Sequence, residues 1–353
     1  MNGTRPPTPG RRLASARLHR SGRDPQRVLL VTESVLLGAS TAAPFAELLA
    51  DRVATRTGRG LDLDIAWDLG PVLRAVTHST EAWRLWRYEA VVVLARTSGE
   101  EDAGGWRRER IRRIADQVLP ELARASSVLI VRIGAPSPRD HRWDGPTVSS
   151  LRVPDDEDGA GRGGADAVAD RLVGLLGAAD REAGAGTGGT ARERRDLPQP
   201  EAERQQAVDR VTDALGGLTP HLERVVLLAR NTFGVPFAQV NLLDHGRIRT
   251  LAYVGAAGDD AEQPICTITV RGSGPTIIAD TWEDHRLDAN PHVHAAAHPV
   301  RFYAAHPIES LDGYRIGTLC VFDLVPHDPA DVDPAVLRDL AQLAEAEIST
   351  LPD

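Results

Sequence analysis

Residues 181–200 read REAGAGTGGTARERRDLPQP, and this segment most limits what the chain can fold into. Its glycines, charged side chains and prolines have little to bury, so we expect a linker. The parts on either side carry different charge: residues 1–200 hold 30 Arg against 27 acidic residues, a balance of +3, and residues 201–353 hold 11 Arg against 23, a balance of −12. Together they give the net charge of −9. We therefore predict two domains.

The composition excludes several classes of protein. Two cysteines among 353 residues cannot form a disulfide framework, and they favour a reducing compartment. The first apolar run, residues 28–38, is interrupted by Thr32, Glu33 and Ser34, so it forms neither the core of a signal peptide nor a membrane span. A net negative chain also argues against nucleic-acid binding. We expect a cytoplasmic protein with no nucleic-acid or membrane partner.

The first half alternates strand and helix patterns. Residues 1–26 are rich in Arg, Pro, Gly and Ser, which predicts a disordered basic tail. Within residues 27–180, short apolar runs are separated by helical patterns. These runs are residues 28–31, 61–67, 91–95 and 127–133. Such alternation is typical of βαβ units, so we predict an α/β domain with a doubly wound parallel sheet.

A serine follows the first of these runs. The order Thr32-Glu33-Ser34, then Leu-Gly-Ala-Ser and a helix, resembles the first block of the SGNH/GDSL hydrolases, in which Gly-Asp-Ser presents the nucleophile. Ser34 takes that serine's place. The family's other blocks are missing, because residues 95–100 contain no Asn and residues 158–165 contain no His. Since a serine needs an oriented base and an oxyanion hole, we expect an inactive domain in which Ser34 is vestigial.

The second half has a different pattern. A helical face in residues 221–233 is ended by Gly234, and a hairpin with a His245-Gly246 turn follows. The strand-like runs are residues 237–244, 248–255, 264–270, 276–281, 301–308 and 315–323. An amphipathic helix over residues 334–348 closes the chain. Helix, antiparallel strands and helix predict an α+β sandwich over residues 201–353.

The motifs FGVPFAQVNLLD, TIIADTWEDHRLDANP, VRFYAAHPI and DGYRIGTLCVFD stand in an order that resembles a bacterial GAF domain, over about residues 218–348. The resemblance implies a six-stranded antiparallel sheet, a pocket on the face opposite the flanking helices, and use as a small-molecule or redox sensor. It names no ligand or cofactor. The chain has no lysine for the cyclic-nucleotide signature of the family, and neither cysteine stands in a context for attachment of a bilin.

Four residues form the candidate ligand-binding set: Cys266, Phe302, Tyr303 and Cys320. In the family, Cys266 would lie before the helix beside the pocket, and Cys320 lies in the Gly-Thr-Leu-Cys-Val strand. Phe302 and Tyr303 point to opposite faces of a strand, so one packs in the core while the other can touch a ligand. If the two thiols face each other they can form a redox switch; otherwise they are buried small side chains.

A histidine-rich segment offers the spacing of a metal site in His292, His294 and His298. It corresponds to a loop of variable composition in GAF domains, and nothing in the sequence makes the three imidazoles converge. We therefore predict no metal.

These observations favour a GAF-domain sensor or regulator that is not itself an enzyme. It would bind an unidentified small molecule or sense redox state, and signal to a partner or to residues 27–180. The helices in residues 201–233 and 334–351 are the expected homodimer contact. An SGNH-type serine esterase under GAF control, with Ser34 as nucleophile, is the alternative, and a protein-binding scaffold is a third hypothesis.

Overall fold

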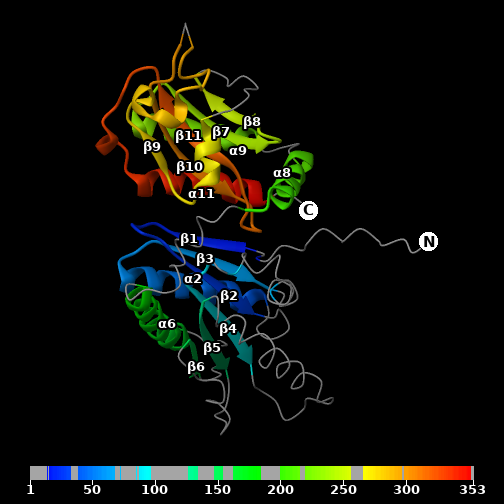
Figure 1. Cartoon of the computed structure of the whole chain (residues 1–353). Coiled ribbons are helices and arrows are strands. Elements are labelled where there is room, and N and C mark those ends of the chain that lie inside the picture. Colours follow the sequence, from blue (N-terminus) through cyan, green and yellow to red (C-terminus); the bar gives the residue numbers. More distant parts are fainter. Residues whose placement is uncertain are drawn as a thin grey trace, which may run out of the picture. The chain divides into compact units, whose positions relative to one another are not determined.

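The computed structural model describes residues 14, 16–32, 39–67, 72, 85, 87–96, 126–133, 147–153, 162–183, 199–214, 219–255, 265–295 and 298–350. The chain divides into two compact units, Met1–Arg195 and Asp196–Asp353, and each is described by itself (Figure 1). Within the described ranges, none of the helices combines the length and the hydropathy needed to span a bilayer.

The first unit is built on a six-stranded sheet in the order β1-β3-β2-β4-β5-β6. Its strands are β1 (Ala16–Arg20), β2 (Gln26–Thr32), β3 (Leu61–Ala66), β4 (Ala90–Arg96), β5 (Ser127–Ile133) and β6 (Val148–Val153). Strands β2 to β6 run parallel to their neighbours, and only β1 is antiparallel, to β3. The predicted parallel sheet is confirmed. The order β3-β2-β4-β5-β6 is that of a flavodoxin-like sheet.

Strand β1 corrects one prediction, because it lies within the segment expected to be a disordered tail. Arg17 on β1 pairs with Asp64 on β3 at 2.5 Å, and the Asp64 side chain is fully buried. His19 lies 2.9 Å from Asp62 in the same ladder. The tail prediction rested on a composition with few apolar residues to bury, whereas the structure pairs charged residues of this segment with acids of the neighbouring strand. Residues 16–20 therefore belong to the sheet.

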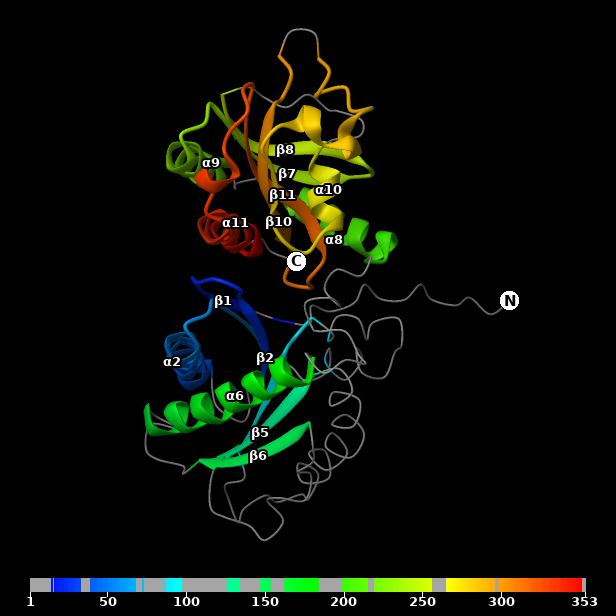
Figure 2. The same ribbon diagram turned by 60° about the vertical axis from the view of Figure 1, so that its left-hand side comes forward.

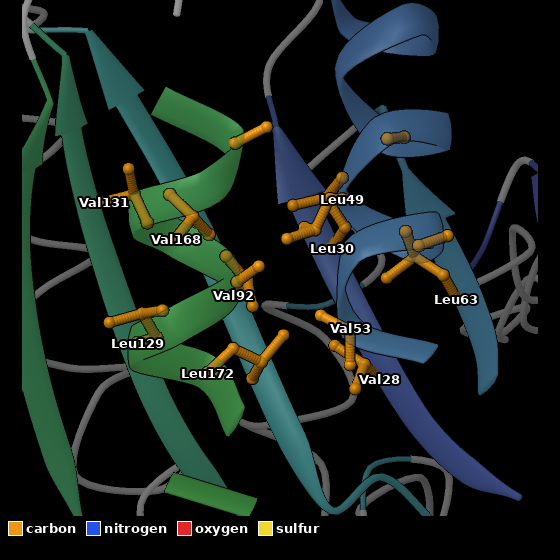
Figure 3. Packing of buried hydrophobic residues seen from close by; sticks show 14 of the residues in the cluster. Val28, Leu30, Leu49, Val53, Leu63, Val92, Leu129, Val131, Val168 and Leu172 are labelled. Carbon is orange, nitrogen blue, oxygen red and sulfur yellow. The ribbon is translucent and has the colours of Figure 1, made fainter. Parts of the chain in front are cut away.

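Helices α2 (Ala39–Thr57) and α6 (Arg162–Ala183) contact each other and cover one face of this sheet. Figure 3 shows Leu49 and Val53 of α2 and Val168 and Leu172 of α6 lying over apolar residues of the strands. These strand residues are Val28, Leu30, Leu63, Val92, Leu129 and Val131. One of the helical patterns between the apolar runs of the sequence, residues 106–125, lies outside the described residues.

The second unit contains a five-stranded antiparallel sheet in the order β8-β7-β11-β10-β9. The strands are β7 (Phe237–Asp244), β8 (Arg247–Val254), β9 (Thr276–Ile278), β10 (Phe302–Glu309) and β11 (Arg315–Asp323). The predicted β7–β8 hairpin is confirmed, and its turn residues His245 and Gly246 both have positive φ, 48° and 76°, as a type I′ turn requires.

The expected sixth strand, residues 264–270, is instead the short helix α10 (Cys266–Arg271). Its Thr and Ile residues favour a strand by propensity. However, Cys266, Thr269 and Val270 are buried, and their i, i+3, i+4 spacing forms one face of a helix. Packing of that face overrides the local preference, so the prediction of six strands is wrong.

The remaining helices are α8 (Glu201–Ala214), α9 (Thr219–Phe233) and α11 (Pro334–Ser349), so the expected first flanking helix is two helices. Helices α9 and α11 contact each other and the sheet. Figure 2 shows them on one side of the sheet and α10 on the other. The sheet face that α9 and α11 do not cover is therefore the face beneath α10.

Candidate functional site

The pairing of the strands decides which side chains share the α10 face. Cys320 on β11 lies opposite Ala305 on β10 and Gln239 on β7. Thr318 lies opposite Asn241, and Tyr303 lies opposite Phe322. Residues that stand directly opposite each other in a ladder point to the same face. Cys320, Thr318, Asn241 and Tyr303 therefore gather on one face, and Cys266 is the first residue of the helix above them.

The two thiols meet at this place. Asn241 Nδ2 lies 3.5 Å from Cys320 Sγ and 3.8 Å from Cys266 Sγ, and both cysteines are free thiols. They belong to one apolar cluster together with Tyr303 and Ala305, which keeps them buried, with exposed fractions of 6% for Cys266 and 1% for Cys320. The sequence left open whether the thiols face each other, and the structure brings them together.

The surroundings make the two thiols unequal. A hydrogen bond from the Cys320 thiol is the largest cause that lowers the pKa of Cys266 to about 6, against the opposing effect of burial. The hydroxyls of Thr318 and Tyr303 and the Asn241 amide lower it further. The same contact with Cys266, together with burial, raises the pKa of Cys320 well above its usual range. Cys266 is thus the more acidic thiol of the pair.

Burial raises the pKa of Tyr303 well above its usual range, so the phenol stays protonated beside the thiolate. Several deeply buried polar atoms here make no hydrogen bond of normal geometry within the described part of the chain. They are Asn241 Oδ1, Thr269 Oγ1, Tyr303 Oη and Thr318 Oγ1. Native proteins rarely leave so many buried polar atoms together without partners, and such clusters occur at functional sites. The face combines a reactive thiol pair with neutral hydrogen-bonding groups.

A buried arginine holds α10 in this position. Arg315, which begins β11, donates from Nε to the carbonyl oxygen of Val270 at 2.8 Å, and its Nη2 lies 3.4 Å from that of Arg271. These carbonyls belong to the last turn of α10, where a cation satisfies free acceptors. Gln199 accepts from the backbone N–H of Arg315 and donates to the carbonyl of Gly313. The end of α10 is thereby tied to the start of β11.

Three of the four predicted ligand-binding residues, Cys266, Tyr303 and Cys320, lie together on the α10 face. Phe302 does not: it points to the opposite face, where its ring centroid lies 4.5 Å from that of His327. Asn241, Thr269 and Thr318 were missed. Cys320 was selected as a cysteine within a predicted strand, and alternation along that strand places Thr318, two residues earlier, on the same face, so a signal for Thr318 was present. For Asn241 there was no comparable signal, because its place depends on the pairing of β7 with β11.

In the first unit, Ser34 lies outside the described residues. The buried polar centre that the structure does describe is Asp64, which accepts from Arg87 Nη2 at 2.9 Å and from Tyr88 Oη at 2.7 Å. Burial by itself would raise the pKa of Asp64, but Arg17, Arg87 and Arg27 outweigh it and hold the pKa below its usual range. This network fastens β1 and the segment around Tyr88 to β3, and we interpret it as structural.

One described cluster could present three metal ligands: Asp209, Asp244 and His245, whose ligand atoms lie within 4.8 Å of one another. Gln205 Nε2 already donates to both carboxylates, at 2.9 and 2.7 Å. Exposed acidic groups often stand near one another in this way, and we assign no metal to them. The predicted candidates His292, His294 and His298 do not appear in such a cluster within the described ranges.

Comparison with known proteins gives partial matches. No family model matches the chain. A cyclic di-GMP phosphodiesterase of Pseudomonas aeruginosa is 33% identical over 159 residues, 44% of this chain and 27% of that protein. The match thus spans about a quarter of the relative's length. The resemblance of the first unit to SGNH hydrolases gains no support from these comparisons and rests on its sequence motifs alone.

Similar solved structures include free methionine-R-sulfoxide reductases. The enzyme of Thermoplasma acidophilum has 15% identity and a TM-score of 0.32, covering 39% of this chain and 96% of its own. The enzyme of Neisseria meningitidis, solved with its substrate, has 18% identity and a TM-score of 0.31, covering 42% and 87%. A GAF domain from an Acinetobacter phosphoenolpyruvate-protein phosphotransferase has 14% identity and a TM-score of 0.29, covering 42% and 93%.

Proposed function

We propose that the second unit is a GAF-type sensory domain, which receives its input on the α10 face and regulates a partner protein or the first unit. The observation that carries this proposal is the buried cluster of two thiols, three hydroxyls and an amide on the sheet face away from α9 and α11. The order of the sequence motifs and the helix–sheet–helix arrangement support the same assignment.

Two kinds of input suit these groups. A small polar molecule would supply partners for the unpartnered oxygens of Asn241, Thr269, Tyr303 and Thr318. Oxidation would act on the Cys266 and Cys320 thiols. Both inputs would change the position of α10 on the sheet. The strands that carry the site also contact α9 and α11 on the other face, so the change can reach these helices.

The similarity to a segment of a cyclic di-GMP phosphodiesterase supports a role in signalling. It does not assign that activity to this chain, because the match covers 27% of the other protein. We therefore propose sensing as the work of this unit.

Native mass spectrometry of the full chain, combined with hydrogen exchange of α9 and α11, tests this function. A bound small molecule, or an oxidised form, should change the exchange of these helices. Thr318→Val should weaken the response, because it removes a hydroxyl from the site at almost constant volume. Thr212→Val is the matched control, since Thr212 on α8 also has an unpartnered hydroxyl but is not one of the groups that shift the pKa of Cys266. Exchange that is identical in every state would exclude a sensor.

Self-association is a part of this proposal that can be tested separately. The flanking helices expose Leu227 and Leu228 on α9 and Leu343 on α11, each close to half exposed. Apolar side chains on helices of a sensory unit suit a contact with a second copy of the chain. Light scattering should report a dimer for the full chain, and Leu228→Glu should shift it toward the monomer. A monomer at every concentration would remove the dimer but leave the sensor proposal in place.

A further inference from the structure

We infer that Cys266 and Cys320 are a redox-active dithiol, in which Cys266 reacts with a small hydroperoxide and Cys320 closes a disulfide. This inference deepens the proposed sensory function by naming its input. It assigns Cys266 as the attacking residue and Cys320 as the resolving residue of one modification site.

The two thiols lie next to each other in the fold. The thiols come from different elements, the start of α10 and the middle of β11, and the Asn241 amide reaches both, at 3.8 and 3.5 Å. Two sulfurs that both lie within 4 Å of one nitrogen atom are neighbours, and a disulfide requires them to approach to about 2 Å. Because the pair links a short helix to the sheet, closing the disulfide would draw the start of α10 toward β11.

The surroundings of the two cysteines favour different roles. Cys266 is the more acidic thiol of the pair, and its neighbours Tyr303 and Thr318 carry hydroxyls that can stabilise charge on sulfur. A thiolate is the form that attacks peroxides, whereas Cys320 keeps its proton until the second step. Cys266 is also the less deeply buried of the two, at 6% against 1% exposure.

Burial selects the class of oxidant. With both cysteines below one-tenth exposure, a bulky disulfide such as oxidised glutathione cannot approach in line without displacing α10. Hydrogen peroxide is small and neutral, and it matches the polar, uncharged groups around the thiols. A hydroperoxide is therefore the oxidant that the site fits.

The chemistry balances in two steps. In the first, Cys266 sulfur attacks one peroxide oxygen, an S–O bond forms, the O–O bond breaks, and the second oxygen leaves as water after taking up a proton. In the second, Cys320 sulfur attacks the sulfenic sulfur, an S–S bond forms, the S–O bond breaks, and the hydroxide leaves as water with the Cys320 proton. The peroxide is reduced by two electrons, and the protein loses two hydrogen atoms.

The test is peroxide treatment of the reduced full-length protein, followed by intact mass and non-reducing peptide mapping. The expected product has lost two hydrogens, joins the Cys266 and Cys320 peptides, and is reversed by a thiol reductant. In Cys320→Ala, oxidation should stop at a sulfenic acid on Cys266, which a dione probe captures. In Cys266→Ala, Cys320 should react more slowly than Cys266 does in Cys320→Ala, because Cys320 is the more deeply buried of the two.

Thr318→Val keeps both cysteines and covers the case in which an alanine variant fails to fold. It should slow disulfide formation, while Thr212→Val should not. No cross-link in the wild-type protein, or equal reactivity of the two cysteines, would overturn the inference. The two proposals can be rejected separately. A disulfide that forms without any change in the exchange of α9 and α11 would reject the sensory function. A ligand-induced change in these helices, without a disulfide after peroxide treatment, would reject the redox-active dithiol.

Discussion

The side-chain amide of Asn241 donates a hydrogen bond to the sulfur of Cys320 at 3.5 Å, although 79 residues separate them in the sequence. The contact exists because β7 and β11 are neighbours in the sheet, with Asn241 opposite Thr318 and diagonal to Cys320. A buried amide donor next to a thiol pair stabilises negative charge on sulfur. The order of strands in the sheet thus decides the chemistry of the thiols.

Replacing Cys320 by Ala should raise the pKa of Cys266, because the Cys320 hydrogen bond is the largest cause of its low value of about 6. A hydrogen bond to a charged group is worth about 1.5–3 kcal/mol, which corresponds to roughly one to two pKa units. Thr318→Val should give a smaller rise, and Thr212→Val none. The pH dependence of thiolate ultraviolet absorbance measures the shift. An unchanged titration in Cys320→Ala would show that the thiols do not interact.

The reduced protein should become more stable as the pH rises from about 6 to about 9. The pKa of Cys266 is about 6 in the folded chain, against a reference value of 9.0, so between these values the unfolded state binds more protons. The contribution is complete above the unfolded pKa and is lost as the pH falls through 6, with a slope of at most about 1.4 kcal/mol per pH unit. Urea unfolding at several pH values measures it.

Cys266→Ala is the comparison that isolates this group, because the other titrating residues remain in both proteins. The difference in unfolding free energy between wild type and variant should grow with pH across the window. Above pH 9 the raised pKa of Cys320 acts in the opposite direction, so the trend should end there. A difference that stays constant from pH 6 to 9 would contradict a depressed Cys266 pKa.

Asp64→Asn should destabilise the first unit by about 3–5 kcal/mol, because it leaves Arg17 and Arg87 facing a buried neutral amide. Asp51→Asn is the matched control: it also breaks a pair with an arginine, Arg20, but the Asp51 side chain is 58% exposed, and its loss should cost about 0–1 kcal/mol. Urea denaturation of the full chain compares them. Similar losses of unfolding free energy in the two variants would mean that the buried ion pairs of Asp64 contribute no more to stability than an exposed pair.

Gly317→Ala should disturb the pairing of β7 with β11. A Cβ atom at Gly317 would overlap the carbonyl oxygen of Asn241, and it would lie 2.9 Å from the carbonyl carbon of that residue. Backbone must therefore move, which we expect to cost about 1–3 kcal/mol and to slow oxidation of the thiols by displacing Asn241. Gly174→Ala, on α6 with open space around it, should instead stabilise by up to about 1 kcal/mol. In thermal unfolding, the midpoint should be lower for Gly317→Ala and higher for Gly174→Ala than for the wild-type protein.

Local pattern was sufficient for much of the architecture. The parallel strands of the first unit follow from apolar runs that are buried on both faces, and the β7–β8 hairpin follows from the His245-Gly246 turn. The composition of residues 181–200 indicated two units, and alternation along residues 302–323 separated Phe302 from Tyr303. Each of these features depends on neighbours in sequence, so periodicity and turn chemistry report them directly.

Tertiary contacts decided the rest. Residues 266–271 have strand propensity but form a helix, because packing of Cys266, Thr269 and Val270 on the sheet outweighs a preference of under about 1 kcal/mol per residue. Arg17 belongs to a strand because its guanidinium pairs with the buried carboxylate of Asp64 on β3. The sequence by itself determined that Cys320 lies in a strand of the second unit. Only the fold decided that Cys266 and Asn241 lie next to Cys320 on the sheet face beneath α10, since contacts between residues far apart in the chain depend on the packing of whole elements.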